Sequence, residues 1–309
     1  MQQKPSICGN NVCEPDEEVS YCLDCNLSCE SELCNSKINI ICEGCSETQK
    51  ELLPTLFEHQ TIVYDCLSEY FGYYPPRMVY HKITNNVNSN PCDKTDGCYI
   101  TGGIAERLVI RQGFIPGLRE YNESDVKKEE NVGFEVHELA HVFTYYAFGD
   151  CVPAWFSEGI SIYTDSRLQC HSNRILSSQM DDNNFPLQYR RLNNGEVNLD
   201  EIAPYDEYYK VKHNAHVIGA MYFSALEQDY NCREACIADI LYSLYQYRQN
   251  CTGTCFENAK NSYPYPINNS ISINDLRIPV ITNKIIKQKS EDVIGYNLTF
   301  LFDLLKIDI

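Results

Sequence analysis

The stretch GFEVHELAHVFT, residues 133–144, decides how the rest of the sequence is interpreted. Within it, His137 and His141 lie four positions apart, and Glu138 directly follows the first histidine. Apolar residues recur around them at helical spacing, and residues i and i+4 of a helix lie on one face. Both imidazoles can therefore bind one ion, so this His-Glu-x-x-His pattern predicts a zinc site.

A zinc ion in a catalytic site has three protein ligands and one open position, so a third ligand is required. The segment PAWFSEGISIY, residues 153–163, starts a second helical pattern and carries Glu158, seventeen positions after His141. Glu158 is the predicted third ligand. Glu138 lies about 100° around the helix from His137, which favours a role as general base toward a zinc-held water over direct binding.

These two segments resemble the peptidase-MA-like gluzincins, which show His-Glu-Leu-x-His, a short Gly-containing loop and then Pro-x-Trp-x-x-Glu-Gly-x-Ala-x-Tyr. Upstream, LSEYFGYYPPRMVY at residues 67–80 looks like the helix of that group that ends in Phe-Gly before the first strand. The resemblance covers about residues 50–230. It implies an α+β, thermolysin-like zincin fold with a mixed sheet and the zinc helix in one lobe and a mainly helical second lobe. It also implies zinc on His137, His141 and Glu158, with Glu138 as the catalyst.

The resemblance further implies a Tyr or His on a later helix that stabilises the oxyanion. The candidates are His216, His213, Tyr209 and Tyr208. Related aminopeptidases have a Tyr three residues before a Gly on that helix, and the corresponding HVIG, residues 216–219, favours His216. The sequence departs from thermolysin-type enzymes at Ile162, where they carry a carboxylate; Asp165 and Glu135 are possible substitutes.

Apolar periodicity predicts the remaining elements. Helices are expected at 46–74, 131–148, 154–165, 212–230 and 232–247, strands at 77–83 and 107–111, and an amphipathic tail at 286–309. The strand at 107–111, preceded by Gly102-Gly103, is expected to border the active-site cleft, where its main chain could pair with an extended substrate; a simple turn before a strand is the alternative.

The first 46 residues contain eight of the seventeen cysteines and little aliphatic periodicity. Their opening, CGNNVCEPDEE at residues 8–18, resembles a short extracellular repeat, which implies a disulfide-stapled module that could mediate surface attachment. Zinc binding by the paired cysteines is the alternative. We therefore expect a module at 1–46 and a peptidase domain at 47–309. Its sheet and zinc-helix lobe is expected at about 47–150 and its helical lobe at about 151–309. Cys232 with Cys236, and Cys251 with Cys255, are predicted bridge sites.

The composition narrows the class of protein. A net charge of −18 argues against nucleic acid or anionic lipid as a partner. Seventeen cysteines, together with five Asn-x-Ser/Thr sequons, favour an extracellular, glycosylated protein. No apolar run approaches the ~20 residues that span a bilayer. The first residues lack the apolar stretch of a signal peptide, which is then expected to have been removed or replaced by another export route.

The leading interpretation is a secreted zinc metallopeptidase that acts on peptide or protein substrates. The absence of a Gly-x-Met-Glu-Asn motif tilts the prediction slightly toward an endopeptidase. Two alternatives stay open at this point: a zinc-bearing adhesion or binding protein without turnover, and a zinc amidase.

Overall fold

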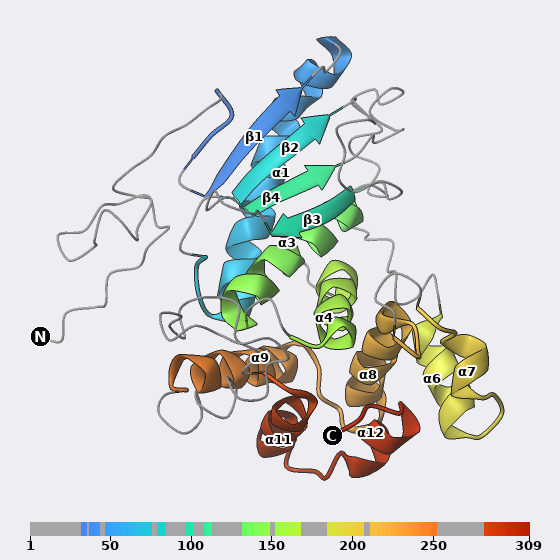
Figure 1. Cartoon of the computed structure of the whole chain (residues 1–309). Coiled ribbons are helices and arrows are strands. Elements are labelled where there is room, and N and C mark those ends of the chain that lie inside the picture. Colours follow the sequence, from blue (N-terminus) through green and yellow to red (C-terminus); the bar gives the residue numbers. More distant parts are fainter. Residues whose placement is uncertain are drawn as a thin grey trace, which may run out of the picture. The chain divides into compact units, whose positions relative to one another are not determined.

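The computed structural model describes residues 32–35, 37–43, 47–75, 79–84, 97–101, 108–112, 132–148, 152–167, 184–206, 211–251 and 281–309 (Figure 1). The chain divides into two compact units. The first comprises Met1–Phe143 and Gln169–Leu176, and the second comprises Thr144–Leu168 and Ser177–Ile309. The boundary falls inside a helix, between Phe143 and Thr144.

The first unit contains a four-stranded mixed sheet with the order β1-β2-β4-β3. Its strands are β1 (Ile38–Glu43), β2 (Val79–Thr84), β3 (Gly97–Thr101) and β4 (Leu108–Gln112). β1, β2 and β4 are parallel, and β3 pairs antiparallel with β4. β4 thus has a neighbour on both sides, so the expected pairing of the strand at 107–111 with substrate is wrong, because its main-chain groups are already bonded to β2 and β3.

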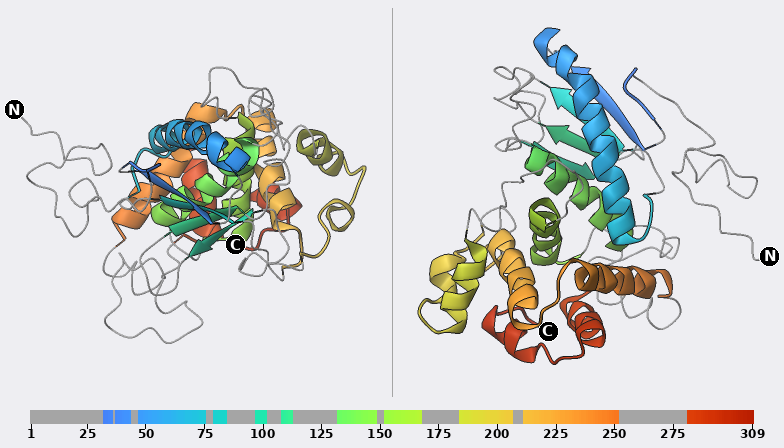
Figure 2. Two further views of the ribbon diagram at one scale, coloured as in Figure 1. Left: turned by 90° about the horizontal axis from the view of Figure 1, so that it is seen from above. Right: turned by 180° about the vertical axis from the view of Figure 1, so that it is seen from behind.

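Helix α1 (Glu47–Phe71) lies along one face of this sheet, as the view from behind in Figure 2 shows. Val63, Tyr64, Leu67 and Phe71 form its buried stripe. The helix ends at Gly72, whose φ of 73° lies in the left-handed region that glycine adopts without strain. The helix predicted for 46–74 is confirmed.

The second unit is helical in the residues described. Its elements are α4 (Ala154–Arg167), α6 (Phe185–Asn193), α7 (Leu199–Ile202), α8 (Ala215–Asp229), α9 (Glu234–Gln249), α11 (Asn283–Ile294) and α12 (Thr299–Leu304). Helix α3 (Val132–Phe148) begins in the first unit and ends in this one. The prediction of a mainly helical second part is confirmed, as are the helices expected near 131–148, 154–165, 212–230 and 232–247.

The core of this unit forms around α8, where Ala220, Met221, Tyr222 and Phe223 are fully buried. Trp155 packs edge-on against Tyr222 and Phe302, with ring centroids 5.1 and 6.1 Å apart. Its indole Nε1 donates a hydrogen bond to Asn283 Oδ1 at 3.0 Å. Large aromatic side chains therefore hold α4, α8, α11 and α12 together.

The cysteine-rich module predicted for 1–46 lies largely outside the described residues. β1 falls within that range and pairs with β2, so the sheet begins before residue 46. The expected bridge between Cys232 and Cys236 is confirmed. Cys34, Cys66 and Cys251 are also disulfide-bonded. Within the parts described, no helix is long and apolar enough to cross a bilayer.

Candidate metal centre

Helix α3 presents His137 and His141 one turn apart. Their Nε2 atoms lie 3.2 Å from each other, and their ring centroids are 4.8 Å apart. Two nitrogens bound to one tetrahedral zinc at ~2.0–2.1 Å would be about 3.3 Å apart. The two imidazoles therefore already have the separation that a shared metal ion requires.

The apolar packing of α3 fixes the direction of these imidazoles. Leu139, Ala140, Val142 and Phe143 are fully buried, and this leaves the two histidines on a different side of the helix. Phe143 packs against Tyr64 and Phe71 of α1, with ring centroids 5.2 and 5.5 Å apart. The Tyr73 hydroxyl donates a hydrogen bond to the carbonyl oxygen of Phe143. α3 is thus anchored at Phe143, two residues beyond the second histidine.

The last turn of α3 connects the histidines to the helix that carries Glu158. Phe148 contacts Phe156 of α4, with ring centroids 6.2 Å apart. Arg248 of α9 donates a hydrogen bond from its Nη1 to the carbonyl oxygen of Ala147 at 3.2 Å. This contact satisfies one of the carbonyl groups that the end of a helix leaves without a partner in the helix.

Helix α4 begins after Pro153, whose carbonyl oxygen accepts hydrogen bonds from the backbone N–H groups of Phe156 and Ser157. Phe156 and Ile160 are buried, so the first turn of α4 is held in the core of the second unit. Glu158 follows that first turn, between Phe156 and Ile160, and is only 3% exposed. An ionised carboxylate with so little access to water requires a cation or strong hydrogen-bond donors.

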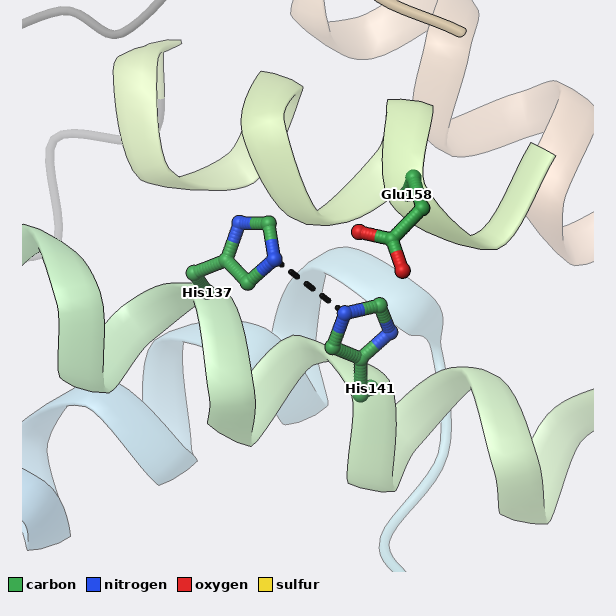
Figure 3. A group of neighbouring side chains, drawn as sticks. All are labelled: His137, His141 and Glu158. Atoms are coloured by element: carbon green, nitrogen blue, oxygen red, sulfur yellow. Dashed lines mark hydrogen bonds between the residues drawn. The ribbon is translucent and has the colours of Figure 1, made fainter. Parts of the chain in front are cut away.

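His137, His141 and Glu158 form a group that could hold a metal ion, since one potential ligand atom from each lies within 4.8 Å of the others. Figure 3 shows both imidazoles on α3 pointing toward the Glu158 carboxylate on α4. His137 and Glu158 are buried and His141 is half-buried. Two imidazoles and one carboxylate suit zinc and other divalent transition metals.

Several other predicted site residues lie outside the part of the chain whose side chains the structure describes. Glu138 lies on α3, one residue after His137, but its side chain is outside what the structure describes. The same holds for the side chains of Glu135 and Asp165, and Tyr208 and Tyr209 lie outside the described residues altogether.

Of the two histidines near α8, His213 makes its contacts elsewhere. It is 8% exposed, and its Nδ1 lies 3.2 Å from the Ala203 carbonyl oxygen and 3.6 Å from Asp200 Oδ1. His216 instead lies against the metal group, with its Nε2 2.9 Å from Glu158 Oε2. The sequence indicated His216 as an oxyanion donor but did not predict this contact with Glu158.

The contact between His216 and Glu158 was not predicted because it depends on how α4 and α8 cross. The spacing of residues along the sequence does not indicate which helices cross. One signal was present in the sequence. A glycine directly follows Glu158, and another follows His216 by three residues. Small residues at matching positions on two helices are typical of a close approach of their backbones.

No protein-family model matches the sequence, and no curated protein matches it significantly.

Proposed function

We propose that this protein is a zinc-dependent metallopeptidase of the gluzincin type. The observation that carries the proposal is the buried group of His137, His141 and Glu158. Two imidazoles one helical turn apart, joined by a carboxylate from a second helix, are the ligand set of a catalytic zinc site with one position left open. Glu138 follows His137 in the sequence, where a general base of this reaction class stands.

In this proposal the residues have separate tasks. His137, His141 and Glu158 hold zinc, which when bound lowers the pKa of water to roughly 7 and polarises a carbonyl group. Glu138 takes the proton from the attacking water and later passes it to the departing amine. A donor such as His216 would stabilise the negative oxygen that develops on the substrate.

The fold is compatible with this assignment. A mixed sheet, the helix that carries both histidines and a mainly helical second unit are the parts that a thermolysin-like zincin needs. The proposed substrates are peptides or proteins, with internal bonds favoured over terminal ones. The seventeen cysteines, of which Cys34, Cys66, Cys232, Cys236 and Cys251 are disulfide-bonded, support an extracellular site of action.

Metal content and proteolysis, measured on matched variants, test the proposal. Wild type is expected to hold about one zinc per chain by elemental analysis, and Glu158→Ala to lose it. Glu138→Gln is expected to keep the metal but to cleave an unstructured protein at least ~100-fold more slowly, because the general base is removed. Glu69→Gln, at an exposed glutamate of α1, is the control and should behave like wild type.

Each other outcome points to a defined alternative. Wild type without any bound metal would overturn the proposal. Zinc with no cleavage of proteins or peptides would indicate the binding protein, and zinc with cleavage of small amides alone would indicate the amidase.

A further inference from the structure

The Asn-Leu-Thr sequon at residues 297–299 lies at the turn that joins α11 to α12 (Figure 1). Of the five sequon asparagines, the structure describes this one and Asn250. A glycan is bulky and hydrophilic, so an asparagine that carries one must lie at the surface of the folded protein. Asn297 and Thr299 are both exposed, while Leu298 between them is fully buried. The asparagine and the threonine that define the sequon therefore both face solvent.

The backbone of this turn is fixed on both sides of the asparagine. Gly295 ends α11 in the left-handed region, and the Leu298 N–H donates a hydrogen bond to Glu291 Oε1 at 2.7 Å. Asn297 Oδ1 accepts a hydrogen bond from the Thr299 N–H at 2.8 Å. Among the residues that the structure describes, none forms a hydrogen bond with Asn297 Nδ2. The atom to which an N-linked glycan attaches is thus the unused end of a side chain that the turn holds in place.

Two exposed aromatic side chains flank the sequon. Tyr296 and Phe300 are 64% and 61% exposed, the highest values among the large apolar side chains that the structure describes. The Tyr296 ring also packs against Tyr230, with ring centroids 6.0 Å apart, so its position is fixed. Apolar side chains that gather at one place on a surface typically mark a contact site. A sugar ring has C–H groups that pack on flat aromatic faces, and a glycan on Asn297 would begin between these two residues in the sequence.

Asn250 differs from Asn297 in its surroundings. It ends α9 in a helical conformation, with φ of −90° and ψ of 0°, and its backbone N–H donates to the Gln246 carbonyl oxygen at 3.0 Å. The next residue, Cys251, is 2% exposed and disulfide-bonded. A buried disulfide at the middle of the tripeptide competes with its use as a glycan acceptor. We therefore expect Asn250 to stay unmodified.

We propose that Asn297 carries an N-linked glycan whose first sugars cover Tyr296 and Phe300. The co-reactant is a lipid-linked oligosaccharide pyrophosphate. Asn297 Nδ2 bonds to the anomeric carbon of the oligosaccharide as the bond from that carbon to the pyrophosphate oxygen breaks. The lipid pyrophosphate leaves with the electron pair, and Nδ2 loses one proton to a base of the transferase. The inference rests on the extracellular site of action proposed above and does not depend on the metal group.

The test is mass spectrometry of peptides from the full chain, secreted by eukaryotic cells behind a cleavable signal peptide. Removal of glycans by an amidase in heavy-oxygen water turns each glycosylated asparagine into a labelled aspartate. Asn297 is expected to be labelled and Asn250 unlabelled. On a gel, Asn297→Gln and Thr299→Ala should each lose the mass of one glycan. Thr299→Ser, which keeps the sequon, and Asn250→Gln are the controls and should migrate like wild type.

Hydroxyl-radical footprinting tests whether the glycan covers the two aromatic side chains. Removal of the glycan should raise the oxidation of Tyr296 and Phe300. It should leave unchanged the oxidation of Tyr242, an exposed tyrosine on α9. Unchanged oxidation at Tyr296 and Phe300 would overturn this part of the inference.

The remaining outcomes separate the inference from the proposed function. Glycans at other sequons beside an unmodified Asn297 would overturn the inference alone. A secreted chain without a glycan at any sequon would overturn it together with the extracellular site of action. A glycan at Asn297 on a chain that holds no zinc would support the inference and overturn the proposed metallopeptidase.

Discussion

Helix α8 contacts its neighbours in two different ways along its length. Its N-terminal half meets α4 through the backbones of Gly159 and Gly219, with no side chain between them. Its C-terminal half meets α6 through long polar side chains. There the Tyr189 hydroxyl donates to Asp229 Oδ2 at 2.5 Å, and Arg190 Nε donates to Gln228 Oε1 at 2.6 Å.

The two contacts differ in how much change they tolerate. The exposed side chain of Arg190 can adopt other rotamers, so its part of the α6 contact can absorb a substitution at a modest cost. Two touching backbones cannot move apart without shifting a whole helix, because interiors are close-packed. Since Glu158 and His216 lie beside the glycines, the rigid contact is the one that holds the site. The N-terminal half of α8 is thus held at a fixed distance from α4, whereas the C-terminal half can shift slightly against α6.

Gly219→Ala should produce the largest effect, because the new methyl group would overlap the backbone of α4. We expect a loss of about 1–3 kcal/mol or more in the free energy of unfolding. Zinc affinity should fall at least tenfold, because a shift of α4 displaces Glu158, a proposed zinc ligand. Urea denaturation and chelator competition measure the two quantities.

Gly295→Ala is the matched control, since it makes the same chemical change away from the site. Gly295 ends α11 with a φ of 77°, where alanine is strained but meets no atom. It should lose about 1 kcal/mol of stability and no zinc affinity. Equal zinc affinities for Gly219→Ala and Gly295→Ala would contradict the view that the contact between α4 and α8 holds the site.

Tyr189→Phe should have the next largest effect, at the adaptable end of α8. It removes a hydrogen bond to a carboxylate, which typically contributes ~1.5–3 kcal/mol. Because α6 is far along α8 from His216, we expect unchanged zinc affinity. A fall in metal binding that matched the loss of stability would show that the two halves of α8 are not independent.

The dependence of stability on alkaline pH tests the contact between α6 and α8 separately. Burial, with a further contribution from Asp229, raises the pKa of Tyr189 above its usual value of 10.0. The folded state therefore retains a proton that the unfolded chain releases, so the stability is present below pH ~10 and is lost as the pH rises further. Urea denaturation between pH 9 and 11 should show a shallower decline for Tyr189→Phe than for wild type. Identical slopes would contradict the assignment.

Arg190→Ala should have the smallest effect. The side chain of Arg190 is exposed, so its hydrogen bond to Gln228 competes with water. The expected loss is within ~0.5 kcal/mol in thermal unfolding, with metal content unchanged. A larger loss would mean that the α6 contact is less adaptable than its geometry indicates.

The sequence predicted most strongly what depends on local spacing. The helical periods of α1, α3, α4, α8 and α9 are continuous, and each helix was located to within a few residues. His137, His141 and Glu158 were predicted as a group because residues i and i+4 share a face of any helix, so the motif needs little tertiary information. The structure brings these three together, while the identity of the metal stays a prediction.

What the sequence did not predict depends on neighbours distant along the chain. β1 was attributed to the cysteine-rich segment. Its apolar stretch is short, and it forms a strand by pairing with β2, which lies far along the sequence. The shielding of β4 by β3 could not be anticipated without the sheet order. α6 was overlooked because Pro186 and polar residues hide its period, although proline is favoured in the first turn of a helix.

The disulfide between Cys232 and Cys236 has a consequence for the conditions in which this protein is prepared. It closes the turn between α8 and α9, and a loop this short contributes about 2 kcal/mol in the chain-entropy treatment. That contribution depends on the redox potential of the medium. The bridge and His216 lie at opposite ends of α8, roughly 20 Å apart at 1.5 Å per residue. Oxidant and metal therefore act on the two ends of one helix, and each can be varied in the buffer while the other is held constant.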